Sequence, residues 1–229
     1  MTFTEQLRQE NDDVFQKIFT HPFVDGIGRG DVPKDSIIHY VKADFEYLNA
    51  FMKIYALSMV KAKSRDDIRF FFDQIGFVLN DEVHPHHNFC DYVGVEYEAL
   101  QSSSLPPTAD HYIKHMMHHA QTGTIAEIYA ALLPCPWTYL EIGQELLKTY
   151  KPTKSHPFYE WITFYADEEV ERITLELRHR LDQEAQDVSQ EQKQLIKEAF
   201  RKSCELEWKF WEMAYICETW PSEQEASRI

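Results

Sequence analysis

The sequence predicts an all-α fold built from long helices, and three observations support this prediction. Apolar residues recur at helical spacing along most of the chain, and no stretch keeps the apolar–polar alternation of a half-buried strand. Only 7 glycines and 10 prolines occur in 229 residues, which argues against a turn-rich β fold. Hydrophobic residues make up 44% of the chain and aromatic residues 14%, so a large core can be buried. No repeat or linker-like stretch interrupts the pattern, and we expect one domain over residues 1–229.

The N-terminal part of the chain predicts two helices separated by a loop. Residues from about 4 to 19 have an amphipathic pattern, and three glycines between residues 21 and 33 are typical of a flexible loop. Pro33 suits the first turn of a long second helix, because its ring fixes φ near the helical value. This second helix carries a broad apolar face over residues 37–55.

The middle of the chain predicts two further helices. Ser64 is followed closely by two aspartates, which is typical of a helix start, since the serine caps free N–H groups and the acids match the helix dipole. We expect this helix to run to about residue 93 and to bend at Pro85. After two prolines, Thr108 is expected to cap a helix that continues through residue 119.

The C-terminal half predicts three more helical stretches. Thr124 opens a helix that is interrupted near residue 135 and resumes to about residue 150. A loop over residues 151–157 follows, and then come helices over about 158–184 and 190–219.

The interruption places Cys135 between Pro134 and Pro136, at the end of an apolar run. A proline lacks an N–H and clashes with the carbonyl four residues back, and it also disfavours helical dihedrals at the residue before it. We therefore expect the helix to break at the thiol, so that backbone groups near Ala130 and Leu132 can face a ligand or water. A purely structural cysteine needs no such break, which makes Cys135 the first candidate for chemistry.

The composition excludes several classes of partner. A net charge of −15 argues against nucleic acid, since phosphate binding relies on clustered lysine and arginine. No segment resembles a signal peptide, and no apolar run approaches the ~18 residues that span a bilayer, so we expect no membrane association. The 4 cysteines are far apart, without a C-x-x-C pair. The sequence therefore predicts a protein of the reducing cytoplasm, where a thiol stays available.

Several side chains share a predicted helix face with other polar groups. Tyr139 lies four residues after Cys135, so the two face the same way if the helix resumes. Asp44 and Tyr47 share a face that is otherwise apolar, and a carboxylate there is costly to bury without a partner. Asp44 is alternatively a surface residue at the edge of that face, or the structural partner of an arginine.

The last helix carries two glutamates with different expected environments. Glu207 lies close to its apolar stripe, whereas Glu205 leans away from it. For either glutamate alone, a solvated helix face is the favoured interpretation. A thiol, carboxylates and tyrosines from different helices together indicate nucleophilic catalysis on a small polar aromatic ligand.

Histidines are numerous between residues 84 and 119, but they indicate a metal site only weakly. His111 with His115, and Glu82 with His86, have the i,i+4 spacing that could hold a metal. A di-iron bundle needs Glu-x-x-His pairs from two helices, and the sequence offers only the pair that begins at Glu176. We therefore expect no metal.

Five segments together resemble a known family. The spacing between them makes the resemblance specific, whereas no single segment does. They are His21-Pro22-Phe23-Val24 with Gly26-Ile27-Gly28; Asp44 with Tyr47; Ala126-Glu127 through Leu133-Pro134-Cys135; His156-Pro157 with Trp161-Ile162 and Tyr165; and Glu207 ahead of Phe210-Trp211. Over nearly its whole length, the chain resembles the TenA, or thiaminase II, family.

The resemblance implies a heme-oxygenase-like multi-helix bundle, usually assembled as a homotetramer. It also implies hydrolysis without a cofactor at the methylene carbon of a 4-amino-2-methylpyrimidine. One substrate is 4-amino-5-aminomethyl-2-methylpyrimidine, which loses ammonia, and another is thiamine, which loses its thiazole. Both yield 4-amino-5-hydroxymethyl-2-methylpyrimidine for thiamine salvage.

Carried over position by position, the resemblance implies that Cys135 is the nucleophile that adds to the pyrimidine ring. It implies that Glu207 is the proton donor for the leaving group, since only Glu207 fits the spacing Glu-x-x-Phe-Trp. Tyr47 would support the thiol, and Asp44 would bind the amino-pyrimidine edge. Three further tyrosines would line the ring or stack on it: Tyr112, Tyr139 and Tyr165.

Two positions depart from the family pattern. Pro136 follows the cysteine where an aromatic residue is common, and Trp208 follows the glutamate where a tyrosine is familiar. Neither departure removes a catalytic group, but Pro136 can alter the local helix geometry.

Two other functions remain open on the sequence. A heme- or di-iron-binding oxygenase of the same fold would need a histidine placed to ligate heme, or a set of carboxylates and histidines, because a fold does not fix a function. A non-catalytic regulator is suggested by the acidic surface. The sequence leaves open which of the two pyrimidine substrates dominates.

Overall fold

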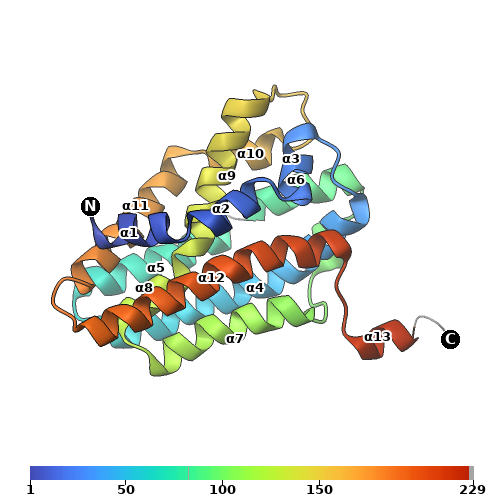
Figure 1. The fold of residues 1–229 in the computed structure, drawn as a ribbon. Helices are drawn as coiled ribbons and strands as arrows, with labels where there is room; N and C mark the ends of the chain where they lie inside the picture. Colours follow the sequence, from blue (N-terminus) through green and yellow to red (C-terminus); the bar gives the residue numbers. More distant parts are fainter. Residues whose placement is uncertain (82, 227–229) are drawn as a thin grey trace.

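The computed structural model describes residues 1–81 and 83–226, and every regular element in this part of the chain is a helix (Figure 1). The prediction of an all-α fold is confirmed. The helices of the first half are α1 (Phe3–Glu10), α2 (Asp12–Phe19), α3 (Pro22–Arg29), α4 (Lys34–Lys61), α5 (Arg65–Asn80), α6 (Val83–Val93) and the 3₁₀ helix η1 (Tyr97–Leu100). Those of the second half are α7 (Pro107–Thr122), α8 (Ile125–Leu132), α9 (Pro134–Tyr150), α10 (Tyr159–Tyr165), α11 (Glu168–Glu184), α12 (Gln190–Ile216) and α13 (Pro221–Ala226).

The two longest helices form the centre of the bundle. α4 has 28 residues and α12 has 27, and the two helices pack against each other. α4 also contacts α5, α6 and α7, while α12 contacts α2, α7, α8 and α9. Figure 1 shows α4, α7 and α12 lying along one another, with α9 crossing them at a steep angle. Within the core, the rings of Tyr40 and Trp211 stack at 5.5 Å between centroids, which joins α4 to α12.

The glycine-containing segment after α2 is helical, so the prediction of a flexible loop over residues 21–33 is wrong for most of its length. His21 caps α3, and Pro22 occupies its first turn. A Cβ added at Gly28 would overlap the ring of Tyr150, so this glycine permits close packing of α3 on α9. Gly30 has a φ of +80° and ends the helix in the left-handed conformation that favours glycine. The glycines therefore serve packing and helix termination.

Three predicted helices are each divided in two. The stretch over residues 4–19 breaks at Asn11, whose side-chain amide donates to the carbonyl of Leu7 at 2.7 Å. Residues 64–93 form α5 and α6, and Pro85 lies in the first turn of α6 instead of bending a continuous helix. The stretch over residues 158–184 divides where Asp167 caps α11. Apolar spacing continues across such short breaks because both pieces face the same core, so the sequence pattern hides them.

Other helix ends differ by a few residues. Ser64 and Thr124 cap α5 and α8 as predicted, and Thr124 forms a capping box with Glu127. α7 begins one residue before Thr108 and continues three residues past the predicted end. α12 ends at residue 216, and the short helix α13 follows it.

The chain around Cys135 is more regular than its prolines predict. α8 ends at Leu132 and α9 begins at Pro134, with Leu133 between them in helical dihedrals (φ −58°, ψ −36°). Pro134 and Pro136 both lie in the first turn of α9, where backbone N–H groups lack a partner within the helix. Cys135 is therefore helical, and the prediction that Pro136 forces it out of helical dihedrals is wrong.

A backbone group freed near this junction is used by the protein itself. The carbonyl of Ala131 accepts a hydrogen bond from the Ser203 hydroxyl of α12 at 2.8 Å. This bond ties the junction between α8 and α9 to the central helix. Within the described residues, no helix has the length and apolar character needed to cross a membrane.

Candidate active site

A pocket opens beside Cys135 between α9 and its neighbours. Cys135 and Tyr139 contribute from α9, and Tyr165 contributes from α10. The remaining wall comes from α4, α5 and α11 and is mainly apolar, with Gln74 of α5 as an amide among those side chains. The i,i+4 spacing of Cys135 and Tyr139 therefore places both on the pocket face, because α9 is continuous through them.

Tyr47 of α4 lies against the thiol. Its hydroxyl and the Cys135 thiol are hydrogen-bonded, and the Met116 sulfur lies 3.7 Å from the same hydroxyl. Burial, reinforced by the nearby Cys135, raises the pKa of Tyr47 well above its usual range. The phenol therefore keeps its proton at neutral pH. It donates this proton to the Met116 sulfur, and it can donate to the Cys135 sulfur instead once the thiol has ionised.

Glu207 of α12 is a buried acid, with 3% of its surface exposed. Burial raises its pKa to about 8, the hydrogen bond from Tyr112 opposes this rise, and the charge of Asp44 adds to it. The Tyr112 hydroxyl lies 2.7 Å from one carboxyl oxygen, and the Thr138 hydroxyl lies 3.4 Å from the other. Glu207 is therefore protonated at neutral pH, the state required of a proton donor.

Glu205 has the opposite environment. Its carboxylate is exposed and pairs with Arg201 at 2.7 Å. The helical spacing had predicted this difference between the two glutamates, because residues two apart on a helix face different directions. The interpretation as a solvated helix face is right for Glu205 and wrong for Glu207.

Asp44 is buried, so its interpretation as a surface residue is wrong. Its Oδ2 atom lies 2.7 Å from Nε2 of His86, which makes a histidine of α6 its partner instead of an arginine. The other ring nitrogen of His86, Nδ1, lies 3.0 Å from the Tyr97 hydroxyl of η1. Burial and the charge of Asp44 raise the pKa of Tyr97, so this hydroxyl also keeps its proton.

Aromatic rings surround these polar groups. The ring of Tyr139 lies 4.8 Å from that of Tyr165 and 5.2 Å from that of Trp211, measured between centroids. The Tyr139 hydroxyl is also hydrogen-bonded to that of Tyr40 at 2.8 Å. The rings of Tyr47 and Tyr112 lie 5.2 Å apart. Such rings can enclose a planar heterocycle and still offer hydroxyl groups to it.

Sequence reasoning missed three polar members of this cluster. Tyr40 had a signal, since it lies one turn before Asp44 on the same face of α4. The sequence contains no such signal for His86 and Tyr97, because each meets its partners only through the packing of α6 and η1 on α4. The resemblance named all seven candidate residues, and the structure brings them into one buried region.

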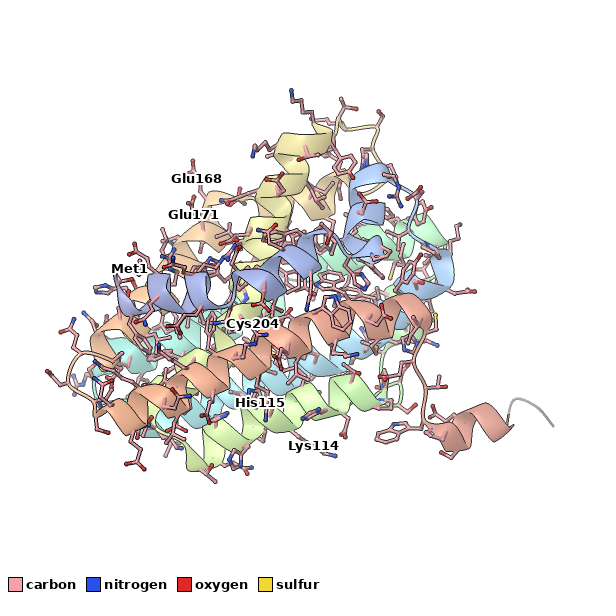
Figure 2. All side chains as sticks on the ribbon, viewed as in Figure 1. Met1, Lys114, His115, Glu168, Glu171 and Cys204 are labelled. Atoms are coloured by element: carbon pink, nitrogen blue, oxygen red, sulfur yellow. The ribbon has the colours of Figure 1, made fainter. Side chains whose placement is uncertain are left out.

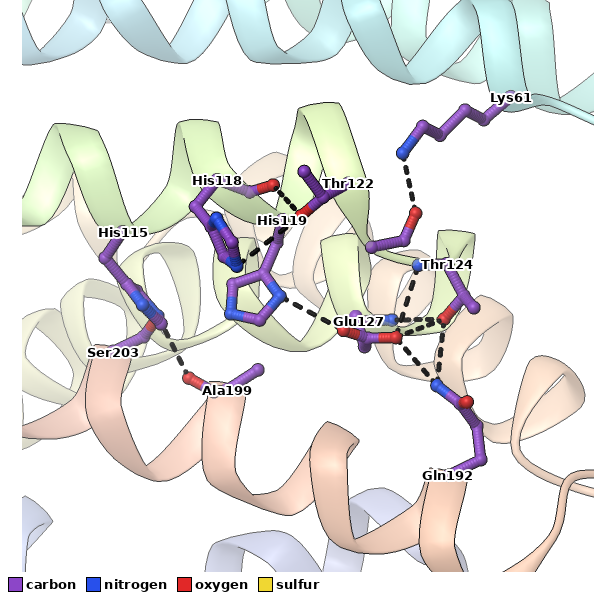
Figure 3. A network of polar contacts seen from close by, with 11 residues as sticks. Lys61, His115, His118, His119, Thr122, Thr124, Glu127, Gln192, Ala199 and Ser203 are labelled. Carbon is purple, nitrogen blue, oxygen red and sulfur yellow. Dashed lines mark hydrogen bonds and ion pairs between the residues drawn. The ribbon is translucent and has the colours of Figure 1, made fainter.

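His115, His118 and His119 belong to a separate polar network between α7, α8 and α12 (Figure 3). Nε2 of His115 lies 3.1 Å from the Ser203 hydroxyl, and Nδ1 of His119 lies 3.3 Å from a carboxylate oxygen of Glu127. Figure 2 places His115 on α7, facing α12. Within the described residues, no three His, Cys, Asp or Glu side chains are grouped as a metal site. Glu82, which was paired with His86 on spacing, lies outside the described residues.

The chemical groups present suit covalent catalysis. They comprise the Cys135 thiol hydrogen-bonded to the phenol of Tyr47, and the protonated carboxyl group of Glu207. The carboxyl group of Asp44, hydrogen-bonded to a histidine, and aromatic walls complete the set. A nucleophile beside an acid can attack an electrophilic ring and protonate what leaves. The carboxylate can accept hydrogen bonds from an amino group of a bound ligand.

The comparisons with known proteins agree on one family. The model of the TENA/THI-4/PQQC family matches residues 7–216. A protein of Staphylococcus saprophyticus named aminopyrimidine aminohydrolase is 35% identical over 222 residues, which covers 96% of each chain. Among solved structures, a TenA homologue from P. horikoshii OT3 is 26% identical, with a TM-score of 0.83 over 94% of this chain and 99% of that one.

A further structural match confirms the predicted fold. A Shewanella denitrificans OS217 domain of unknown function, described as having a heme oxygenase-like fold, superimposes with a TM-score of 0.72. The two chains are 16% identical, and the match covers 93% of this chain and 92% of that one. The bundle described above is therefore heme-oxygenase-like.

Proposed function

Since this chain belongs to the TENA/THI-4/PQQC family, we propose that it is an aminopyrimidine aminohydrolase of thiamine salvage. Its substrates are 4-amino-5-aminomethyl-2-methylpyrimidine and thiamine, and its pyrimidine product is the 5-hydroxymethyl compound. The observation that carries the proposal is the pairing of the Cys135 thiol with the neutral phenol of Tyr47, in one cluster with the protonated Glu207.

In the proposed reaction, Cys135 adds to the pyrimidine ring as a thiolate. The Tyr47 hydroxyl stabilises this anion by hydrogen bonding, since a thiolate is the active nucleophile. Addition ends the aromaticity of the ring, and the electron pair it supplies expels the substituent from the methylene carbon. With the aminomethyl substrate, Glu207 gives its proton to the amino group, which leaves as ammonia. With thiamine, the C–N electron pair returns to the positively charged ring nitrogen, and the thiazole leaves as a neutral molecule without a proton.

Water then completes the hydrolysis. It adds to the methylene carbon, and the C–S bond breaks to restore the aromatic ring and the thiolate. The proton that water loses returns to the Glu207 carboxylate with the aminomethyl substrate, and goes to the solvent with thiamine. Every step uses groups of this chain, so the proposed reaction needs no metal or organic cofactor.

The remaining groups bind the substrate. Asp44 accepts a hydrogen bond from the amino group of the pyrimidine, because a carboxylate is an acceptor. The rings of Tyr112, Tyr139 and Tyr165 enclose the heterocycle and exclude water.

We also propose that the chain acts as one domain in the cytoplasm and assembles as a homotetramer, with no nucleic acid partner. Exposed apolar side chains at helical spacing along α5 support an interface: Ile68, Phe72 and Leu79. Light scattering on the purified protein tests the assembly, which should have about four times the 27.2 kDa mass of the chain. A monomer would contradict it.

The activity is tested by incubating the purified protein with each substrate and measuring release of the hydroxymethyl pyrimidine. Release from at least one substrate is expected, without added metal. Release from neither, together with a stoichiometric heme absorption band, would favour the oxygenase instead.

A further inference from the structure

Asp44 is the first member of a buried chain of three polar groups that join three elements. The chain runs from the Asp44 carboxylate on α4 through the His86 imidazole on α6 to the Tyr97 hydroxyl on η1, with links of 2.7 Å and 3.0 Å. All three residues are buried, and His86 is only 1% exposed. Three elements thus converge to fix one carboxylate.

The direction of the chain follows from its first member. A carboxylate only accepts hydrogen bonds, so Nε2 of His86 donates to Oδ2 of Asp44. A neutral imidazole carries one proton, so Nδ1 is then an acceptor, and the protonated hydroxyl of Tyr97 donates to it. Tyr97 therefore selects the tautomer of His86 that donates to the carboxylate.

This donation determines what Asp44 can offer to a ligand. The bond from His86 occupies Oδ2 and fixes the rotation of the carboxyl group, which leaves Oδ1 and a remaining lone pair as acceptors. A 4-aminopyrimidine presents an amino group beside a ring nitrogen. Two acceptor oxygens match that edge when the ring nitrogen is protonated, because the edge then presents two donors, as an amidinium does.

We propose that His86, with its proton directed by Tyr97, is a positioning residue that holds Asp44 as an acceptor for the protonated amino-pyrimidine edge. The inference rests on the proposed function and deepens it. A ring held as its protonated form is poorer in electrons, which favours addition of the Cys135 thiolate. His86 does not touch the substrate and acts only through Asp44.

The test compares two pyrimidines with the Cys135→Ser protein, so that binding is measured without turnover. One is 4-amino-5-hydroxymethyl-2-methylpyrimidine, and the other is the same compound without its 4-amino group. We expect His86→Leu to weaken binding of the amino compound by at least ~10-fold, as loss of a charge-assisted contact should, and to leave the des-amino compound within ~3-fold.

A conservative variant provides the rescue. The amide nitrogen of His86→Gln reaches about as far as Nε2 of histidine, so binding of the amino compound should return to within ~3-fold. The shorter His86→Asn, which is equally polar, should not restore it. This Gln–Asn pair decides the outcome if His86→Leu does not fold. Tyr97→Phe, which frees the tautomer, should give an intermediate loss that is again specific to the amino compound.

Equal weakening of both compounds by the His86 variants, or no weakening, would overturn the inference and leave the proposed function standing. A different pair of results would overturn the proposed function, and the inference with it. In that case the Cys135→Ser protein, with His86 unaltered, binds neither pyrimidine, and the protein without any substitution hydrolyses neither substrate.

Discussion

The Tyr112 hydroxyl donates a hydrogen bond to the Glu207 carboxyl group across 2.7 Å, from α7 to α12. Both side chains are buried, and burial alone would raise the pKa of Glu207 further than the value of about 8 that it has. Tyr112 thus lowers the pKa of an acid that burial raises. The pair sets the pH above which Glu207 no longer carries a proton.

The first prediction concerns the pH profile. Activity should fall above about pH 8, since Glu207 must be protonated to act as the acid. Tyr112→Phe removes a hydrogen bond that stabilises the carboxylate, so the pKa of Glu207 rises and the alkaline limb of kcat/KM moves to higher pH. The movement should be up to about one pH unit, given ~1 kcal/mol for the bond and ~1.4 kcal/mol per unit.

The control for this profile is Tyr159→Phe, because Tyr159 lies on α10 and is not one of the groups that shift the pKa of Glu207. Its alkaline limb should coincide with that of the unaltered protein. A limb that moved to lower pH in Tyr112→Phe would show that the sign of the Tyr112 effect is wrong.

The second prediction tests the nucleophile. Cys135→Ser should lose at least ~100-fold in kcat, because a serine hydroxyl stays protonated beside Tyr47 and cannot replace a thiolate. Steady-state rates with either pyrimidine substrate measure the effect. Cys217→Ser is the matched control, since Cys217 lies at the end of α12 outside the pocket, and its rate should be unchanged. Near-normal turnover by Cys135→Ser would exclude a covalent role for the thiol.

The third prediction separates two neighbouring glutamates. Glu207→Gln removes the transferable proton from a buried site and should reduce kcat by roughly 100-fold or more. Glu205→Gln removes only an exposed pair with Arg201, which is worth at most about 1 kcal/mol, and should change kcat less than ~3-fold. Both variants are compared at pH 7 with one substrate. The reverse ranking would assign the acid to Glu205.

The sequence predicted the helical class and the broad apolar faces because these depend on local spacing. It did not predict the state of Cys135, because a proline in the first turn and a proline in a helix interior look the same in a short window. It also placed a flexible loop where Gly28 is required by the approach of Tyr150, a contact across more than a hundred residues.

The candidate site was predicted unevenly for the same physical reason. Local spacing placed Tyr139 beside Cys135 and distinguished Glu207 from Glu205. The partner of Asp44 could not be read from the sequence, since His86 meets it only after α6 packs on α4. The roles of these residues came from the family resemblance and remain predictions until the variants above are measured.

The last prediction concerns stability at the pocket wall. Gln74 of α5 is buried and lines the pocket beside Cys135, and no hydrogen bond joins its side-chain amide to another residue that the structure describes. An amide among apolar side chains loses part of its hydrogen bonding to water, at a cost of about 1 kcal/mol. Gln74→Leu has a similar volume and no polar atoms, so the ligand-free protein should become more stable by about 1 kcal/mol.

Urea unfolding of the two proteins measures this change, and Gln144→Leu on the exposed face of α9 is the matched control, expected to stay within about 0.5 kcal/mol. A natural sequence that keeps a destabilising amide in a pocket does so where the amide has a use there. If Gln74→Leu were instead destabilised by 1 kcal/mol or more, the amide would be a structural group of the bundle. A gain in stability accompanied by a higher KM would assign Gln74 to the ligand.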